Sequence, residues 1–287
     1  MTFDFPALGT HFWIEVWDEV TEEQAGKIFD FARFFVSTFE ERYSRFKSDS
    51  LISTLNRERT FENPSEEFVQ LLQYSKQLYL RTNEVFNPLT GHILEARGYD
   101  ANYSFSDSGA SKLAPGNPIT DIIITTERIE LLHGNVDLGG YGKGYLIDLL
   151  ASTLKAELQL EQFLINGGGD IFVTNRGGKA VTIHLEDPTK PGTMIGSTTL
   201  HNQGFAASSP HKRAWKTTTG TTSHIIADQL YADATYIKAT TAADADAFAT
   251  TALQLDPQQL ERLAKSEQLG IALFTANTSS LIANRLF

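Results

Sequence analysis

The sequence contains no cysteine among its 287 residues. This absence excludes disulfide bonds, thiolate metal sites, cysteine nucleophiles and lipid-anchored cysteines together. Basic side chains are also in the minority, because 24 Lys and Arg stand against 35 Asp and Glu, a formal net charge of -11. Contact with nucleic-acid phosphates needs a basic face, so we expect no nucleic-acid partner.

Long hydrophobic runs are missing as well. No window reaches the roughly 20 apolar residues that a membrane span needs. The first ten residues, MTFDFPALGT, lack the basic region and the apolar run of a signal peptide. We therefore expect a cytoplasmic chain with no membrane span. Its composition, 41% hydrophobic and 21% charged, is typical of an ordered protein with one large domain or two lobes.

The most distinctive stretch is VDLGGYGKGYLID, residues 136–148. An apolar approach indicates the end of a strand, four glycines follow, and apolar residues then recur at helical spacing. A strand that turns through glycines into a helix N-terminus leaves backbone N–H groups pointing at one spot, which suits an anion. Lys143 adds a mobile cation and Asp137 an acceptor. A glycine turn needed only for tight strand–helix packing fits the same residues.

Two familiar nucleotide-binding loops do not fit this stretch. A Walker A loop needs Gly four residues before the Gly-Lys pair and Ser or Thr after the lysine, where the chain has Asp137 and Gly144. A dinucleotide fingerprint needs Gly where Tyr145 stands.

Apolar periodicity predicts the surrounding elements. Strands are expected at 10–17, 121–126, 128–132, 162–165 and 180–185, and helices around 28–39, 68–79 and 242–253. Residues 100–118 are rich in Gly, Ser, Asp, Asn and Pro and predict an exposed connection.

Three further stretches carry chemically interesting residues. Asp246 and Thr250 lie four apart in the alanine-rich helix, so both oxygens project from one face and suit Mg²⁺ or Ca²⁺, although such a pair also arises by chance. His224 stands at the head of an apolar stretch predicted as a strand, where a lone histidine is commonly structural. Phe46 lies among small hydroxyl residues in 44–56, which predict a capped loop leading into a short helix.

Taken in order, these segments resemble the ApbE-type flavin transferases, the FAD:protein FMN transferase family. The matching motifs span nearly the whole chain: Leu8-Gly9-Thr10, Ser44–Asn56, Val85-Phe86-Asn87-Pro88, Asp137–Asp148, Asn166–Asp170, Ala207-Ser208-Ser209, Ser223–Ile226 and Ala245–Thr250. The pairing of Asp-Leu-Gly-Gly-x-x-Lys-Gly with a distant Ala-Asp-Ala-x-Ala-Thr is specific.

The resemblance implies an α+β fold, a two-lobed, T-fold-related ApbE-like architecture with FAD in the cleft between the lobes. Residues 1–287 would form this single domain. It implies an Mg²⁺-dependent transferase, with Ca²⁺ as an alternative metal, that moves FMN from the donor FAD to a Ser or Thr hydroxyl of an acceptor protein. AMP leaves.

The resemblance also assigns residues to roles. The flavin nucleotide would contact Leu8, Phe46, Val85, Phe86, Asn87, Asp137, Lys143 and His224. The metal would take the carbonyls of Gly140 and Ala243 and the side-chain oxygens of Asp246 and Thr250. His224 and Asp246 would be the catalytic residues, with His224 able to take a proton from the attacking hydroxyl near neutral pH.

The chain departs from the family pattern after Ile226. The family usually shows Asp-Pro-x-Thr-Gly there, whereas this chain reads Ala-Asp-Gln-Leu at 227–230, and Leu8 stands where methionine is common. Two alternatives therefore stay open. One is a metal-dependent FAD pyrophosphatase, and the other is a non-catalytic FAD-binding protein.

Overall fold

The computed structural model describes residues 1–107, 113–177, 180–217 and 220–287. The chain folds into two compact units, each built from segments that are distant in the sequence. The first, called the sheet unit below, comprises Met1–Glu40, Tyr141–His211 and Gln229–Phe287. The second, called the smaller unit, comprises Glu41–Gly140 and Lys212–Asp228. The predicted exposed connection, 100–118, belongs to the smaller unit, and its residues 108–112 lie outside the described residues.

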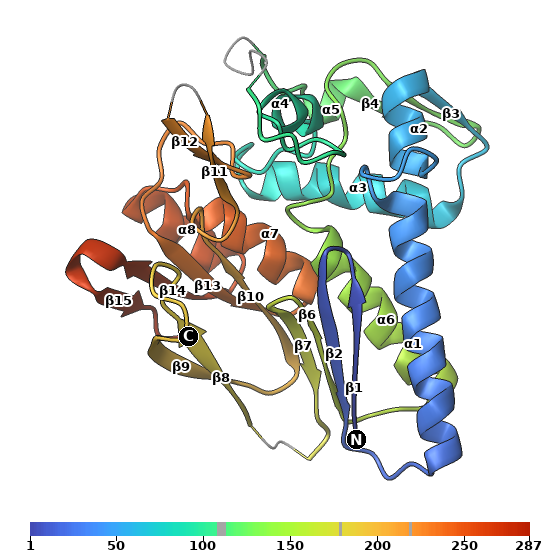
Figure 1. The fold of residues 1–287 in the computed structure, drawn as a ribbon, viewed down its shortest axis with the longest axis vertical. Coiled ribbons are helices and arrows are strands. Elements are labelled where there is room, and N and C mark those ends of the chain that lie inside the picture. The colour runs from blue at the N-terminus through green and yellow to red at the C-terminus, as the bar shows by residue number, and fades with distance from the viewer. Residues whose placement is uncertain (108–112, 178–179, 218–219) are drawn as a thin grey trace. The chain divides into compact units, whose positions relative to one another are not determined.

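The sheet unit is built on an antiparallel sheet that has eight strands in the described residues (Figure 1). Its order is β1-β2-β6-β7-β10-β13-β14-β15. The strands are β1 Thr2–Ala7, β2 Thr10–Val16, β6 Phe163–Gly167, β7 Asp170–Thr174, β10 Gln203–Ser208, β13 Ala234–Ala239, β14 Gly270–Thr275 and β15 Ser280–Ala283. A separate hairpin of β8 (Val181–Glu186) and β9 (Met194–Leu200) completes the β structure of this unit.

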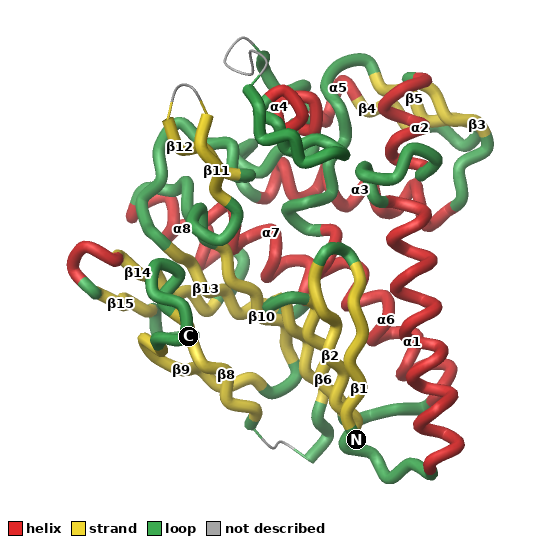
Figure 2. Tube along the Cα trace, in the orientation of Figure 1, coloured by secondary structure: helices red, strands yellow, loops and turns green. Residues whose placement is uncertain are grey.

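Two helices, α6 (Gly142–Leu158) and α7 (Ala242–Ala252), pack against the central strands β6, β7, β10 and β13 (Figures 1 and 2). The long helix α1 (Glu22–Tyr43) contacts β1 through Phe29, whose ring lies 5.8 Å from Phe3 and 6.0 Å from Phe5. Helix α8 (Pro257–Ser266) and a 3₁₀ turn, η2 (Ala276–Thr278), flank β14.

The strand register separates the two faces of the sheet, because residues paired across an antiparallel ladder point to the same side. Phe12 pairs with Gly167, which also pairs with Asp170. A Cβ on Gly167 would lie 3.1 Å from Cδ1 of Ile147 in α6. These residues therefore lie on the face that α6 covers.

The opposite face carries Trp13, Asn166 and Ile171, which pair with one another in the same way. Ile171 belongs to an apolar cluster that joins this face to the β8–β9 hairpin. Its buried members are Leu164, Ile171, Val173, Leu185, Leu200, Phe205, Ala234, Tyr236, Ala272 and Phe274. The hairpin thus packs on the part of this face formed by Leu164, Ile171, Val173 and Phe205.

The smaller unit combines helices with two small antiparallel sheets. The helices are α2 Leu51–Glu58, α3 Glu66–Arg81, α4 Gly91–Ala96 and α5 Pro118–Asp121. One sheet has the order β3-β5-β4, and the other is a hairpin: β3 Thr60–Glu62, β4 Ile122–Ile124, β5 Arg128–Leu131, β11 Ala214–Thr217 and β12 Gly220–Ser223. Ser50 caps α2 by accepting from the Ser53 N–H, so the predicted loop and short helix after Phe46 are confirmed.

Two expectations about strands were wrong. Residues 136–138 form no strand, because the side chain of Asn56 replaces a ladder: it donates to the Val136 carbonyl and accepts from the Val136 N–H. His224 does not begin a strand either. It follows β12, which ends at Ser223, and residues 224–226 have no ladder partner among the described strands.

Gly144 gives a test of how closely α6 and α7 pack. A Cβ at Gly144 would overlap the Ala242 carbonyl, with its carbon 2.6 Å away. We expect Gly144→Ala to lower the free energy of unfolding by about 1–3 kcal/mol, the usual cost of overpacking. Chemical denaturation measures the change. Gly26→Ala is the matched control, because Gly26 lies in α1 with nothing within 4 Å of the added carbon, and there alanine should stabilise by about 0.5–1 kcal/mol. Equal stability of the two variants would contradict the packing.

Candidate functional site

An aspartate of each of the helices α6 and α7 accepts hydrogen bonds from backbone N–H groups at the N-terminus of the other helix. Asp148 of α6 accepts from the backbone N–H groups of Ala242 (2.9 Å) and Ala243 (2.8 Å), at the start of α7. In return, Asp246 of α7 accepts from the Gly144 N–H of α6 at 3.2 Å. The first amides of a helix have no partner in their own helix, and carboxylates suit the positive end of its dipole. Each helix thus closes the exposed end of the other.

Lys143 places its ammonium group among carboxylates of the sheet unit. It forms an ion pair with Asp170, the first residue of β7, and its Nζ lies 3.5 Å from Oδ2 of Asp246. Both carboxylates are buried, with side-chain exposures of 5% and 8%, whereas Lys143 is 21% exposed. The ammonium group can therefore meet an anion from solvent while the buried carboxylates of Asp170 and Asp246 hold it in position.

The donor set on α7 suits a hard divalent cation. Oδ1 of Asp246 has no hydrogen-bond partner among the described residues, and Oδ2 already faces a cation in Lys143. One turn later, the Thr250 hydroxyl lies 3.3 Å from the Ser208 hydroxyl. Within the described ranges no three His, Cys, Asp or Glu side chains form a metal cluster. A cation here would therefore need hydroxyl and carbonyl oxygens in addition to Asp246, the donors that Mg²⁺ and Ca²⁺ accept.

Asp137 holds the glycine turn in the smaller unit. Its carboxylate forms an ion pair with Arg45 and also accepts from the Gly139 N–H. The side chains of Asp137 and Arg45 are 9% and 4% exposed, so this is a buried pair with a structural task. One backbone N–H of the glycine turn is thereby already occupied, and the predicted flavin contact of Asp137 stays a prediction.

Phe46 belongs to an aromatic cluster that also contains Tyr99, Tyr103 and Trp215. Its ring stacks on Tyr103 at 5.3 Å and meets the edge of Tyr99 at 5.5 Å, and Tyr99 stacks on Trp215 at 5.7 Å. The Arg45 guanidinium lies 4.2 Å from the Phe46 ring centre, a cation–π distance. Phe46 thus packs at the edge of an aromatic cluster whose Tyr99 and Trp215 are buried, each 8% exposed, and its contact with the flavin stays a prediction.

The segment Val85–Asn87 lies against the glycine turn. Phe86 is 6% exposed, and a Cβ on Gly140 would lie 3.0 Å from its ring. The Asn87 side chain donates to the Gly116 carbonyl at 2.9 Å and accepts from the Leu89 N–H at 2.8 Å. Val85 is partly buried beside them. The structure thus brings three predicted site residues together, and their contact with a nucleotide stays a prediction.

His224 follows the β11–β12 hairpin of the smaller unit. Its backbone N–H donates to the Arg213 carbonyl at 3.3 Å, which fixes the residue beside the hairpin. Ile225, the next residue, is 5% exposed, so the chain enters the interior directly after His224. The ring itself is partly exposed, as an acid–base group must be to meet a substrate.

Leu8 has a left-handed backbone, with φ of 50°. It forms the β1–β2 turn with Gly9, φ 67°, and positive φ at both central residues is typical of a tight hairpin turn. Its N–H donates to the Glu40 carboxylate of α1 at 3.0 Å. A residue with a Cβ is strained there, and such strain is common at functional positions.

The predicted residues therefore fall into two groups. The sheet unit holds Lys143, Ala243, Asp246 and Thr250 around the α6–α7 junction, with Leu8 in a separate turn, and the smaller unit holds Phe46, Val85, Phe86, Asn87, Asp137, Gly140 and His224. Sequence reasoning missed Arg45, Asp148 and Asp170 as site residues. All three stand inside the recognised motifs, so motif position was the available signal.

None of the described helices combines the length and the apolar character needed to cross a bilayer.

The fold is that of an α+β protein with a glycine turn before α6, and the chain belongs to the ApbE family, whose family model matches residues 8–275. A FAD:protein FMN transferase from Rhodobacter capsulatus is 31% identical over 138 residues, which are 46% of this chain. The match covers only 26% of that protein's length.

Solved structures confirm the predicted ApbE-like fold. An ApbE protein from Thermotoga maritima has a TM-score of 0.83 at 18% identity, covering 99% of this chain and 97% of the other. The apo flavinyl transferase ApbE from Pseudomonas stutzeri gives 0.82 at 17% identity, covering 100% and 95%. The flavin transferase ApbE from Vibrio cholerae gives 0.77 at 15% identity, covering 100% and 97%.

Asp148 gives a pH test of the α6–α7 junction. Burial raises the pKa of its carboxyl from 3.8 to about 7, although the Ala243 and Ala242 amides oppose the shift. Since the folded state holds this proton more tightly than the unfolded chain, the contribution to stability is complete below about pH 4 and is lost as the pH rises through 7. We expect Asp148→Asn to flatten the fall in melting temperature between pH 4 and 7. Asp30→Asn, at an exposed position of α1, serves as the control. Parallel pH profiles for wild type and Asp148→Asn would contradict this assignment.

Proposed function

We propose that this protein transfers FMN from FAD to a Ser or Thr hydroxyl of an acceptor protein and releases AMP. Two findings support the proposal: membership of the ApbE family, and the name of the Rhodobacter capsulatus relative, a FAD:protein FMN transferase. The observation that carries it is the α6–α7 junction, where the Lys143 ammonium group lies 3.5 Å from Oδ2 of Asp246 at the start of α6.

The reaction is a substitution at phosphorus. The acceptor oxygen attacks the phosphorus of the FMN half, the bond from this phosphorus to the bridging oxygen breaks, and AMP leaves with that oxygen. Lys143 offsets the negative charge of the pyrophosphate and of the leaving phosphate, and Asp170 keeps its ammonium group in place. In this scheme His224 takes the proton of the attacking hydroxyl.

The metal in this proposal is Mg²⁺, with Ca²⁺ as the alternative. Asp246 and Thr250 would hold it with side-chain oxygens, and Ala243 and Gly140 with carbonyl oxygens. When bound, it would neutralise part of the pyrophosphate charge. Asp148 fixes the amides of Ala242 and Ala243, and so steadies the first turn of α7 that carries one of these carbonyls.

The remaining residues would bind the nucleotide. Phe46 and Tyr103, the more exposed rings of the aromatic cluster, would contact the flavin, and Val85, Phe86 and Asn87 lie against the glycine turn. Leu8 and Asp137 complete the proposed set.

A direct assay separates this function from its alternatives. We expect purified protein with FAD, Mg²⁺ and a threonine-bearing acceptor to yield AMP and acceptor with an added FMN mass. AMP with free FMN would indicate a pyrophosphatase, and FAD binding without turnover would indicate a non-catalytic protein.

Asp246→Ala should abolish metal-dependent turnover, because Thr250 alone cannot hold a hard cation. The control is Asp244→Ala, two residues earlier in α7 and less buried. Full activity of Asp246→Ala would refute the metal assignment.

His224→Ala should slow FMN transfer by about 10²–10⁴-fold, the usual range for a general base. FAD affinity should change far less, because one hydrogen bond contributes only about 1 kcal/mol. Single-turnover transfer and flavin fluorescence titration measure the two effects. His201→Ala is the control, since His201 is exposed in the sheet unit. Transfer at the parental rate by the His224 variant would show that another group takes the proton.

A further inference from the structure

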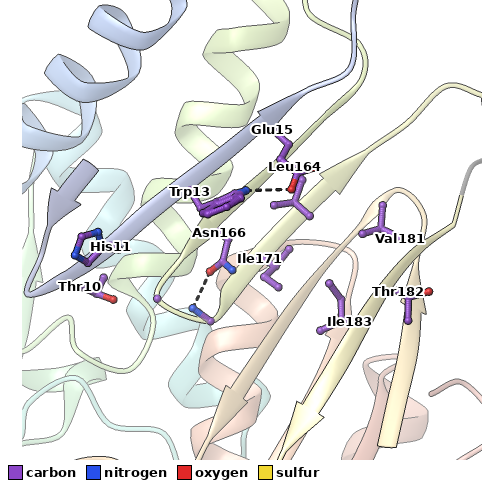
Figure 3. Close-up of a pocket in the computed structure, with 12 residues that line it drawn as sticks. Thr10, His11, Trp13, Glu15, Leu164, Asn166, Ile171, Val181, Thr182 and Ile183 are labelled. Atoms are coloured by element: carbon purple, nitrogen blue, oxygen red, sulfur yellow. Dashed lines mark hydrogen bonds between the residues drawn. The ribbon is translucent and has the colours of Figure 1, made fainter. Parts of the chain in front are cut away.

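A trough lies on the face of the main sheet that α6 and α7 leave open. Its volume is about 550 Å³, within the range of ligand sites. Figure 3 shows Trp13 lying across the strands beside Asn166, with Ile171, Val181 and Ile183 facing the same space. Leu164 and Ile171 form an apolar floor, and the Trp13 side chain is 46% exposed above it. The chemistry proposed for the α6–α7 junction uses none of these side chains.

One wall of the trough is the outer edge of β8. Val181, Thr182 and Ile183 are consecutive and all line the trough, although alternate side chains of a strand point to opposite sides. The strand therefore presents its edge. Among the described residues β8 pairs only with β9, and residues 181–185 make no backbone hydrogen bonds on the other side. An edge of this kind offers N–H and C=O groups to an added strand.

The negative charge of Glu15 indicates which kind of side chain the trough would bind. Among the described residues that line the trough, Glu15 is the one with a carboxylate. The indole N–H groups of Trp13 (3.1 Å) and Trp17 (3.2 Å) each donate to one oxygen of Glu15. The carboxylate is thus held in a fixed position with further lone pairs to offer. The chain as a whole carries a net charge of -11. A positively charged side chain next to an aromatic ring and a fixed carboxylate is the complementary group.

The trough adjoins the hairpin that carries Asp170. Gly168 and Gly169 line one end of it, and Asp170 is the next residue along the chain. Because Asp170 and Ile171 are neighbours on β7, one side chain points to Lys143 and the other to the trough. The same short strand therefore serves the α6–α7 junction on one face of the sheet and the trough on the other.

We infer that the trough binds an extended segment of the acceptor protein, which adds to the edge of β8. Alternate apolar side chains of the segment lie on Trp13 and Ile171, and a Lys or Arg meets Glu15. This inference rests on the proposed FMN transfer for the identity of the partner. The binding of the segment requires neither FAD nor metal, so an experiment can contradict this inference without contradicting the proposed FMN transfer, and the reverse.

The test uses two fluorescein-labelled ten-residue peptides in which valine alternates with serine around a central lysine or a central glutamate. Fluorescence anisotropy is measured with the whole protein without FAD. We expect the lysine peptide to bind wild type about two- to fivefold more tightly than the glutamate peptide, in line with a surface charge pair. Glu15→Lys should reverse that preference, a result that a misfolded variant cannot give. Trp13→Ala should weaken the lysine peptide about tenfold or more, as for a buried aromatic anchor.

Matched controls are Phe34→Ala and Glu19→Lys, an exposed aromatic and an exposed carboxylate outside the trough. Both should leave peptide affinity unchanged. Hydrogen exchange should show added protection of β8 amides with the lysine peptide. No binding, or binding that ignores Trp13 and Glu15, in a protein that transfers FMN would overturn the inference and leave the proposed function intact. Binding as expected by a protein that never transfers FMN would overturn the acceptor as the occupant.

Discussion

The reciprocal exchange of carboxylates between α6 and α7 is the constraint on which the rest of the sheet unit depends. Asp148 and Asp246 satisfy backbone amides that neither helix can satisfy by itself. Glycine at position 144 lets the two helix ends approach until their backbones touch. Neither helix end can move without breaking hydrogen bonds of the other. The side chains of Lys143, Asp246 and Thr250 are therefore held in fixed positions relative to one another.

Elements whose signal is local were predicted correctly from the sequence. The alternation of Phe12, Ile14 and Val16 predicted β2, and all three side chains are buried. Ser50 caps α2, the short helix that residues 44–56 predicted, by accepting from the Ser53 N–H. In each case the partner lies a few residues away, so periodicity and capping chemistry carry the information. Motif order along the whole chain then identified the ApbE family.

Features that depend on distant partners could not be predicted. The strand expected before the glycine turn is absent because Asn56, 80 residues away, takes the place of a neighbouring strand at Val136. Asp137 meets Arg45 across 92 residues, and Lys143 meets Asp170 across 27. The spacing of these residues in the sequence does not predict the pairs, because only the folded chain brings the partners together. The carboxylates of Asp148 and Asp170 were visible in the sequence, but their partners were not.

Strand β7 also limits how the gene can change. Its residues alternate between the ion pair with Lys143 and the apolar cluster beneath the β8–β9 hairpin. Insertion or deletion of a single residue within the strand would turn every later side chain to the other face. The carboxylate of Asp170 could then no longer face Lys143 while Ile171 and Val173 face the apolar cluster, because the change shifts one set relative to the other. Length variation among relatives that keep this lysine pair is therefore expected outside β7, for example in the loops between β8 and β9 or after α8.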